Sequence, residues 1–313
     1  MKKLLLIPII IGGLLAATIT AGVVMTVVSA ANNKDVTNEY ALSDQVITNF
    51  DFDLDTSDVI FVPSELSEQK VVCKETTKTL HEVKVEEGTL KITQHDTRRF
   101  FEMMSWGKKY SVTVYLPKGV YNTFKVESHT GDISISSDYS FVDFNVRLST
   151  GDVSLKANVT NEVKVITSTG NVKCEEITTK SVDITTSTGN VTLNKVTVLD
   201  GIDIGVSTGH IILNETTAST LDATSSTGNM KLANSVMSGD IHLKASTGDI
   251  KFEDSDGANI HVETSTGDVK GTLLTAKVFD VKTTSGKINV PPSGVGGLCY
   301  VRTSTGDVFL SIK

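Results

Sequence analysis

The sequence has few cysteines, prolines and aromatic residues, and it carries no excess of positive charge. Three cysteines among 313 residues are too few for a disulfide framework, and the five prolines and 6% aromatic content are also low. The formal net charge is −8. It becomes −10 without residues 1–31, because two lysines and no acid leave (−8 − 2 = −10). This balance argues against nucleic-acid binding, and the 39% hydrophobic content excludes a wholly disordered chain.

Long apolar runs are also absent, with one exception at the N-terminus. Two lysines precede an uncharged run from Leu4 to Ala31, which is long enough to cross a bilayer about 30 Å thick as a helix. The lysines keep the short N-terminus cytoplasmic and place the rest of the chain outside. We predict that residues 1–31 are a transmembrane signal anchor of a single-pass cell-membrane protein. A long cleaved signal peptide ending near Val28 and Ala30 is the alternative, and it also exports the chain.

Glycine is abundant, and its positions are periodic. Ser-Thr-Gly occurs eight times, and two variants of this tripeptide extend the series to ten. The spacing between successive corner glycines is 19 or 20 residues. These glycines are Gly131, Gly151, Gly170, Gly189, Gly209, Gly228, Gly248, Gly267, Gly286 and Gly306. An internal repeat of this length predicts a solenoid.

Apolar residues alternate with polar ones on both sides of each glycine. The positions two and four after the glycine, and five and seven before it, are apolar almost throughout, although Gly271 supplies no side chain. Period-two alternation predicts a half-buried strand on each side of the corner. The period is too short for helical crossovers. We therefore predict an all-β fold, a parallel β-solenoid of about ten rungs whose handedness the pattern leaves open.

The repeats divide the chain into four parts. Residues 1–31 are the predicted anchor, and the polar residues 32–45 are predicted to be a linker. Residues 46–121 contain short strand-like runs without the regular glycines, so we expect a β cap or irregular rungs there. Residues 122–313 form the regular solenoid repeats.

The residue after each corner glycine is usually Asp or Asn. Half of these positions carry Asn, His or Lys in place of the acid, as at Asn171, His210 and Lys287. A calcium ladder needs about 6–8 oxygen ligands per ion. One acid per rung is too few, so we interpret these side chains as turn caps. The Thr-Ser-Thr tripeptides resemble the hydroxyl ladder of an ice-binding β-helix, but the first threonine has the parity of the apolar columns and is expected to point inward.

Neither the cysteines nor the histidines form a catalytic or metal-binding motif. Cys174 and Cys299 fall in apolar columns, Cys73 has no evident partner, and the six histidines lack the close spacing of metal ligands. We predict no catalytic, cofactor-binding or metal-binding residue, and hence no enzyme and no cofactor.

One segment stands out as a possible contact loop. It contains the single tryptophan within a basic and aromatic stretch. Exposed apolar patches usually mark contacts, so this loop is a candidate binding or membrane-touching tip, and a loop folded over the cap is the alternative. The candidate contact residues are Arg98, Arg99, Phe100, Phe101 and Trp106.

Three stretches followed by the run of corners resemble the bacterial "putative adhesin" family of solenoid domains. The stretches are Phe50–Asp53, Gly88–Ile92 and Tyr115–Gly119, and the resemblance covers about residues 42–313. It implies an envelope-located, non-enzymatic domain, often preceded by a transmembrane segment. It supplies no catalytic or binding residues.

These patterns together predict a membrane-anchored, extracytoplasmic β-solenoid that acts as an adhesin-like binding or scaffold domain of the bacterial cell envelope. Its expected partners are the membrane, through the N-terminal helix, and an envelope glycan or protein. Two alternatives remain open at this point. One is a polysaccharide-acting β-helix enzyme, which needs acids clustered in a cleft. The other is a component of envelope-stress sensing.

Overall fold

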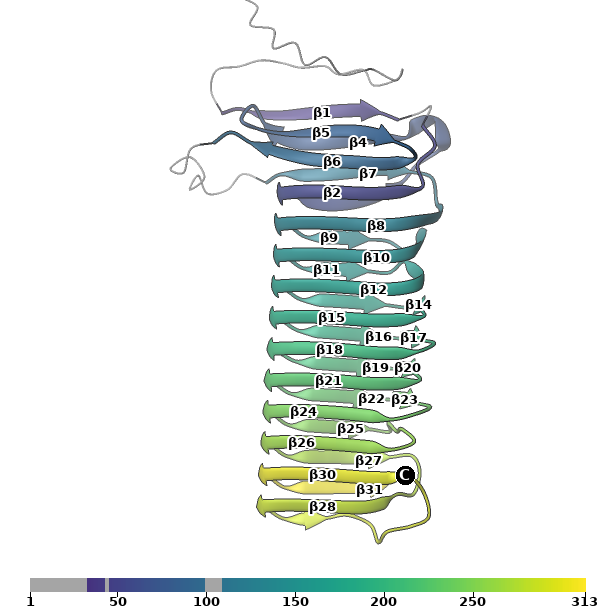
Figure 1. Cartoon of the computed structure of the whole chain (residues 1–313), viewed down its shortest axis with the longest axis vertical. Coiled ribbons are helices and arrows are strands. Elements are labelled where there is room, and N and C mark those ends of the chain that lie inside the picture. Colours follow the sequence, from purple (N-terminus) through teal and green to yellow (C-terminus); the bar gives the residue numbers. More distant parts are fainter. Residues whose placement is uncertain (1–32, 43–44, 99–108) are drawn as a thin grey trace, which may run out of the picture.

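The computed structural model describes residues 33–42, 45–98 and 109–313, and its parallel strands stack into one rod (Figure 1). The prediction of an all-β parallel solenoid of about ten rungs is confirmed. The described part of the chain contains no helix with the length and apolarity to cross a bilayer. The predicted anchor, residues 1–31, lies outside the described residues.

Each rung has a long strand on one face of the rod, which we call the long-strand face. The strand ends at the Ser-Thr-Gly corner, and its neighbours in the stack are parallel and in register. In stacking order these strands are β2 (Asn49–Thr56), β8 (Gly119–Thr130), β10 (Tyr139–Thr150), β12 (Asn158–Thr169), β15 (Ser181–Thr188), β18 (Gly201–Thr208), β21 (Thr220–Thr227), β24 (Ile241–Thr247), β26 (Ile260–Thr266), β30 (Leu298–Thr305) and β28 (Val278–Ser285).

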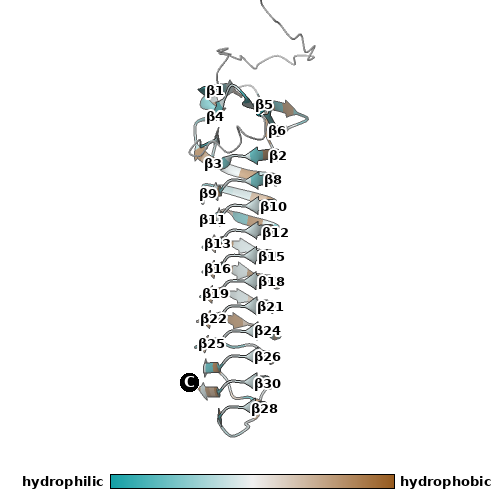
Figure 2. Cartoon of the chain, turned by 90° about the vertical axis from the view of Figure 1, so that its left-hand side faces the viewer, coloured by the Kyte–Doolittle hydropathy of each residue, from teal (hydrophilic) through white to brown (hydrophobic). Residues whose placement is uncertain are grey.

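A shorter strand follows each corner and builds the opposite face, so that the rod has two layers when seen from the side (Figure 2). In the same order these strands are β3 (Asp58–Pro63), β9 (Ile133–Ile135), β11 (Val153–Leu155), β13 (Val172–Glu175), β16 (Val191–Asn194), β19 (Ile211–Asn214), β22 (Met230–Ala233), β25 (Ile250–Glu253), β27 (Val269–Leu273), β31 (Val308–Ile312) and β29 (Ile288–Asn289).

Two-residue strands form a third, narrow side in the middle of the rod. They are β14 (Thr178–Thr179), β17 (Thr197–Val198), β20 (Thr217–Ala218) and β23 (Val236–Met237). The turn before each has a residue at positive φ, such as Glu176 at 55° and Asn234 at 49°.

The core is a set of apolar columns enclosed by the two faces. Val172, Val191 and Ile211 stack in register on β13, β16 and β19, and none has more than 1% of its surface exposed. No single rung encloses these side chains, so the hydrophobic stabilisation comes from stacking neighbouring rungs.

The end of the rod nearest the N-terminus is closed by a cap of mixed strands. Its elements are β1 (Asp35–Ala41), η1 (Leu66–Glu68), β4 (Lys70–Thr76), β5 (Thr79–Glu86), β6 (Thr89–Asp96) and β7 (Ser111–Leu116). Strands β6 and β7 add in parallel to β2 and β3, whereas β5 pairs antiparallel with β6 and β4 with β7. The linker prediction was wrong for residues 35–41, because β1 pairs with β4 along its whole length.

Aromatic side chains gather in the first rungs beside this cap. Phe50 packs edge-on against Phe61 with ring centroids 5.1 Å apart, and Phe124 stacks on Phe144 at 4.9 Å. In the later rungs the core columns consist mainly of Val, Ile and Leu. Much of the small aromatic content therefore lies in this part of the rod.

At the far end, the order of rungs in space differs from their order in the chain. Strand β30 pairs with β26 on one side and with β28 on the other, and β31 is likewise inserted between β27 and β29. The last segment of the chain thus forms the penultimate rung, and residues 278–289 form the outermost one (Figure 1). The sequence pattern predicts the rungs but not this inversion.

Cysteine cross-linking distinguishes the inverted order from a sequential one. Glu263 and Arg302 are register partners on adjacent strands, about 4.8 Å apart, whereas Glu263 and Lys282 lie two strands apart, at about 9.6 Å. A disulfide needs Cα atoms within about 7 Å. We therefore expect the E263C/R302C variant to form an intrachain disulfide under mild oxidation and the E263C/K282C variant not to do so, as read by mass spectrometry of non-reduced peptides. The opposite pattern would show a sequential stack.

Candidate functional site

The corners form a continuous hydrogen-bonded ladder along the rod. The side chain after each corner glycine, except Lys287 on the outermost rung, accepts a hydrogen bond from the backbone N–H of the equivalent residue in the next rung, at 2.7–3.0 Å. Asp58, which follows Ser57 in the first rung, accepts in the same way from the N–H of Asp132 at 2.9 Å. His210 accepts through Nδ1, which places its ring proton on Nε2. These contacts confirm the interpretation as turn caps, because the neighbouring rung already uses one acceptor atom of each of these side chains.

The corner glycines are required by close backbone approach. A Cβ on Gly209 would lie 2.0 Å from the carbonyl oxygen of Gly189, and Gly209 has φ of 146°. The inward orientation expected for the first threonine of the tripeptides is also confirmed. Thr186 is 1% exposed, and its hydroxyl donates to the carbonyl of Gly170. That column is therefore structural and offers no hydroxyl ladder to solvent.

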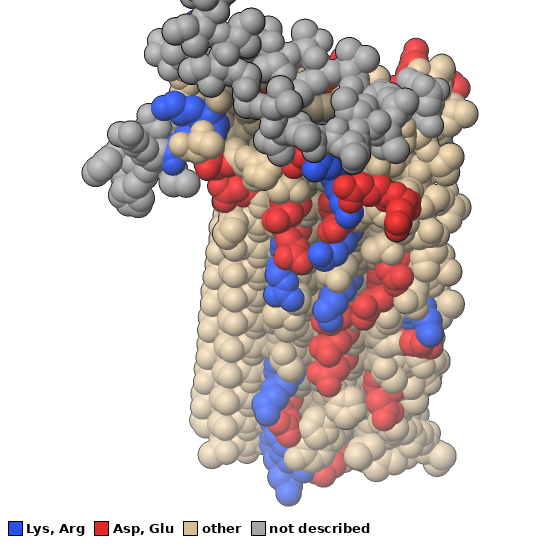
Figure 3. All heavy atoms as spheres, turned by 45° about the horizontal axis from the view of Figure 1, so that its top comes forward, with Lys and Arg blue, Asp and Glu red and all other residues tan. Residues whose placement is uncertain are grey.

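The long-strand face carries ladders of charged side chains, which Figure 3 shows as stripes running along the rod. The ladder six residues before the corner reads, in stacking order, Asp51, Lys125, Asn145, Lys164, Asp183, Asp203, Asp222, His242, His261, Tyr300 and Asp280. Three aspartates follow one another on adjacent strands, and the strand spacing places the backbone of each about 4.8 Å from that of the next. We call Asp183, Asp203 and Asp222 the acidic ladder.

The acidic ladder lines an open hollow of about 480 Å³ on β15, β18, β21 and β24. Burial, followed by the charges of Asp222 and Asp183, raises the pKa of Asp203. Lys164 pairs closely with Asp183 at one end of the ladder. Among the described residues no ion pair compensates Asp203 or Asp222, so the middle of the ladder keeps negative charge that a partner can neutralise.

Three rings continue the ladder beyond the hollow. His242 stacks on His261 with ring centroids 5.5 Å apart, and His261 stacks on Tyr300 at 4.4 Å. The Arg302 guanidinium lies 3.8 Å from the centroid of the Tyr300 ring. His261 lies between His242 and Tyr300, so both faces of its ring are covered and only its edge can form hydrogen bonds. His242 lines the hollow at this end of the stack.

The candidate contact loop is described only at its first residue. Arg98 donates from Nε to both carboxylate oxygens of Asp96, at 2.9 and 2.8 Å, and from one terminal nitrogen to the Tyr110 hydroxyl at 3.1 Å. Burial opposes ionisation of Asp96, but these hydrogen bonds outweigh it and lower its pKa. Arg98 is thus engaged within the protein and only 7% exposed. Arg99, Phe100, Phe101 and Trp106 lie outside the described residues.

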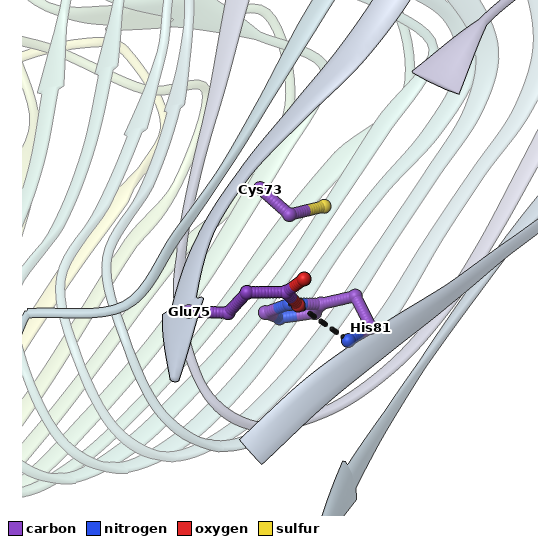
Figure 4. Close-up of side chains that lie close together, drawn as sticks. All are labelled: Cys73, Glu75 and His81. Atoms are coloured by element: carbon purple, nitrogen blue, oxygen red, sulfur yellow. Dashed lines mark hydrogen bonds and ion pairs between the residues drawn. The ribbon is translucent and has the colours of Figure 1, made fainter. Parts of the chain in front are cut away.

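A second candidate lies inside the cap, where buried polar residues converge (Figure 4). Cys73 and Glu75 lie two residues apart on β4, and His81 lies on β5. Their ligand atoms are all within 4.8 Å of one another. Glu75 Oε2 accepts from His81 Nδ1 at 2.7 Å and from the His81 backbone N–H at 2.6 Å. The sequence analysis predicted no metal-ligating residues, whereas the fold brings together three groups whose ligand atoms could hold a metal ion.

The cluster extends to the first corner of the rod. His81 Nε2 lies 2.9 Å from Ser57 Oγ, and Ser57 Oγ lies 3.3 Å from Gln94 Oε1. Ser57, His81 and Glu75 thus follow the order of a hydroxyl, imidazole and carboxylate relay. However, Ser57 is 1% exposed and His81 is 3% exposed, so the hydroxyl is closed to a substrate. The order of the three groups matches a catalytic relay, but their burial is typical of a structural hydrogen-bond network.

The pattern of inward positions is the signal that sequence reasoning missed. Val71, Cys73 and Glu75 share one parity on β4, and Val71 is fully buried. A glutamate at an inward position of a strand is costly unless another group pairs with its carboxylate. His81 occupies the equivalent inward position on β5. The separation of eight residues between Cys73 and His81 does not match a familiar ligand motif.

The sequence that forms the rod matches a family profile. The Toastrack DUF4097 profile matches residues 47–235 and 199–313, which together cover the repeats and most of the cap. The chain belongs to the Toastrack DUF4097 family. The earlier resemblance to a family of adhesin-like solenoid domains is thereby confirmed. No curated protein matches the chain.

Several solved structures are similar to this Toastrack DUF4097 chain. A protein from Parabacteroides distasonis described as a putative adhesin is 12% identical, with a TM-score of 0.49 over 77% of this chain and 97% of its own. One from Bacteroides fragilis, described likewise, is 13% identical, with a TM-score of 0.44 over 90% and 98%. A protein described as a putative lipid-binding protein from Parabacteroides distasonis is 12% identical, with a TM-score of 0.26 over 90% and 98%.

The Toastrack DUF4097 profile includes the acidic ladder and the buried cluster of Cys73, Glu75 and His81. It begins at residue 47, so β1 lies outside the matched residues. The family description gives no ligand and no reaction. Function therefore has to be argued from the acidic ladder and the buried cluster themselves.

Proposed function

We propose that this protein is a membrane-anchored, extracytoplasmic, adhesin-like binding domain of the bacterial cell envelope. Residues 1–31 would hold it in the membrane, and the long-strand face would bind an envelope glycan or protein. The observation that supports this proposal is the acidic ladder. Three carboxylates repeat in register over an open hollow, and two of them have no ion-pair partner among the described residues.

The chemistry of this face favours a partner that carries ammonium or hydroxyl groups at regular intervals. Each carboxylate offers acceptors to a cation or a hydroxyl, and the ladder repeats them at the strand spacing of about 4.8 Å. Each exposed contact contributes only about 0.5 kcal/mol, so binding gains strength from repetition along the rod. A rod with such a ladder suits weak, multivalent contact with a polymer.

Removing the charge of the acidic ladder should weaken binding about tenfold. Three exposed pairs of about 0.5 kcal/mol each sum to about 1.5 kcal/mol, which corresponds to that factor. We would express the full chain in intact cells, verify by added protease that residues 33–313 are accessible from outside, and measure capture of isolated envelope fragments. The D183N/D203N/D222N variant should capture about tenfold less, and higher salt should reduce the wild-type signal.

A matched control removes three acids from elsewhere on the rod. Glu176, Asp200 and Glu215 are exposed and do not line the hollow. The E176Q/D200N/E215Q variant has the same net charge as the ladder variant and should capture envelope fragments as the wild type does. Equal losses in both variants would show that net charge alone acts, and no loss in either would overturn the proposed binding face. A chain that the added protease does not reach would overturn the proposed location.

One observation also favours a polysaccharide-acting enzyme as a second candidate. Such an enzyme needs clustered acids, and stacking brings Asp183, Asp203 and Asp222 together across successive rungs. Carboxylates on adjacent strands, one of them with a raised pKa, are the kind of pair that glycosidases use. Release of reducing ends from captured envelope glycan by the wild type, and not by the D203N variant, would favour this candidate over binding alone.

A further inference from the structure

The buried cluster in the cap differs from the other buried cysteines and charges of the rod. Cys174 lies in an apolar column between Leu155 and Leu193, with no charged group beside it. The buried pair of Lys277 and Asp256, at 2.8 Å, joins opposite charges. In the cap, by contrast, a thiol lies beside a carboxylate whose side chain is fully buried. Among the described residues, no lysine or arginine pairs with Glu75.

The donor set of this cluster suits one class of cation. A thiol, an imidazole nitrogen and a carboxylate oxygen are all within 4.8 Å of one another. Zinc binds this mixture of sulfur, nitrogen and oxygen ligands, with three or four protein groups around the ion. Calcium and magnesium prefer oxygen ligands alone. The thiol therefore favours a zinc-like divalent cation over the hard cations.

A fourth donor lies on the neighbouring strand. Asn38 on β1 is the register partner of Cys73 on β4 and is 5% exposed. Its Nδ2 donates to Glu75 Oε1, whereas its Oδ1 is buried and has no hydrogen-bond partner. A buried carbonyl oxygen without a partner is costly, and coordination to a cation would satisfy it.

The surroundings of His81 match those of a metal-bound histidine. A ligating imidazole usually donates its second N–H to a fixed acceptor, which orients the ring. Here Nδ1 faces Glu75, and Nε2 lies 2.9 Å from Ser57 Oγ. Ser57 can pass its own hydrogen on to Gln94 Oε1 at 3.3 Å, and Tyr40 donates to the His81 carbonyl at 2.8 Å. When the ring proton lies on Nε2 and is donated to Ser57, Nδ1 can exchange its hydrogen bond with Glu75 for a bond to a cation.

We propose that Cys73, Glu75 and His81 bind a zinc-like divalent cation, with Asn38 Oδ1 as the fourth ligand. The ligands come from β1, β4 and β5, and the imidazole also contacts the corner at Ser57 between β2 and β3. The cation therefore ties the cap strands to one another and to the first rung. It closes the end of the solenoid, where open strand edges would otherwise be exposed. This inference does not depend on the proposed binding face.

Cobalt titration of the full chain in detergent tests the site directly. After removal of metals with a chelator, Co²⁺ should bind with a stoichiometry of one per chain and produce a thiolate-to-cobalt charge-transfer band. Zn²⁺ should displace the cobalt and raise the thermal midpoint of the chelated protein. The sequence contains only three cysteines, so the thiolate can come from few places. A spectrum without a thiolate band would overturn the proposal, even if cobalt binds to surface histidines.

Two variants and a control assign the thiolate and the orienting contact. The C73S variant should lose the charge-transfer band, whereas C174S makes the same change at a buried thiol remote from the cap and should keep it. The S57A variant removes only the group that orients His81 and should weaken Zn²⁺ binding about 10- to 100-fold. A band retained in C73S, or lost in C174S, would assign the metal elsewhere. If C73S does not fold, the C174S/C299S variant, in which Cys73 is the only remaining cysteine, should keep the band, and its loss there would overturn the proposal.

Discussion

Replacing Gly209 with alanine should lower the free energy of unfolding by about 3–5 kcal/mol, although it adds a single methyl group. That methyl carbon would lie 2.0 Å from the Gly189 carbonyl oxygen and 2.6 Å from its carbonyl carbon. The neighbour is backbone, so relief requires the rungs to move apart and lengthens the ladder hydrogen bonds. Gly209 also has φ of 146°, which L side chains rarely adopt, and this strain alone costs about 1–3 kcal/mol.

The control for this prediction lies four residues away in the same rung. Gly205 sits on β18, and a Cβ there would meet no atom closer than Thr185 Oγ1, at 3.8 Å. Alanine in place of Gly205 should leave stability unchanged or raise it by about 0.4–1 kcal/mol, because the unfolded chain loses freedom. Urea unfolding followed by far-ultraviolet circular dichroism measures both variants. Similar stabilities for G205A and G209A would contradict the role assigned to the corner.

The regular rungs are predictable from sequence because two independent signals coincide in them. Period-two alternation fixes which residues of each strand face the core, and Gly189 or Gly209 fixes where the chain turns. Each rung repeats both signals at the same spacing, so an error in one rung is corrected by its neighbours. The inward threonine column, exemplified by Thr186, follows from the same parity argument.

The order of the last rungs is not predictable in this way, because all rungs present the same columns. A rung made of β30 and β31 fits equally well below β27 or beyond β29 as far as apolar register is concerned. One residue did carry a signal. Lys287 is the only residue after a corner glycine with no hydrogen-bond acceptor in its side chain. It lies on the outermost rung, where no further corner N–H needs an acceptor.

The cap is not predictable from the repeat spacing, for a different reason. Ser57 takes the place of the corner glycine in the first rung, and its rung stacks on that of Gly131, 74 residues later. The intervening chain forms β4 to β7, so no fixed spacing links the two corners. The buried cluster depends on the same long-range pairing, because Asn38 and Ser57 reach His81 and Glu75 only after the cap strands have assembled.

Replacing Val191 with aspartate should be still more damaging, with a loss of at least about 4–5 kcal/mol and aggregation of the expressed chain as the visible result. Val191 is fully buried on β16, between Val172 and Ile211 in the apolar column. The substitution removes apolar contacts and places a carboxylate where no cationic side chain can reach it. The V191A variant isolates the first effect and should cost about 2 kcal/mol.

The adjacent residue supplies the control that separates burial from charge. Thr192 follows Val191 on the same strand, and its side chain points to the outer surface because successive residues alternate. The T192D variant introduces the same carboxylate into the same rung but leaves it in water, so its loss should stay below about 1 kcal/mol. Thermal unfolding of the four proteins should therefore rank wild type, T192D, V191A and V191D in falling order of stability.

If T192D unfolded as readily as V191D, the cost would come from negative charge on this rung, and the apolar column would not be the main source of stability. A solenoid whose core is continuous must instead be sensitive to the face on which the carboxylate lies, because each residue of a buried column packs against the rungs on both sides and replacing it weakens both interfaces at once.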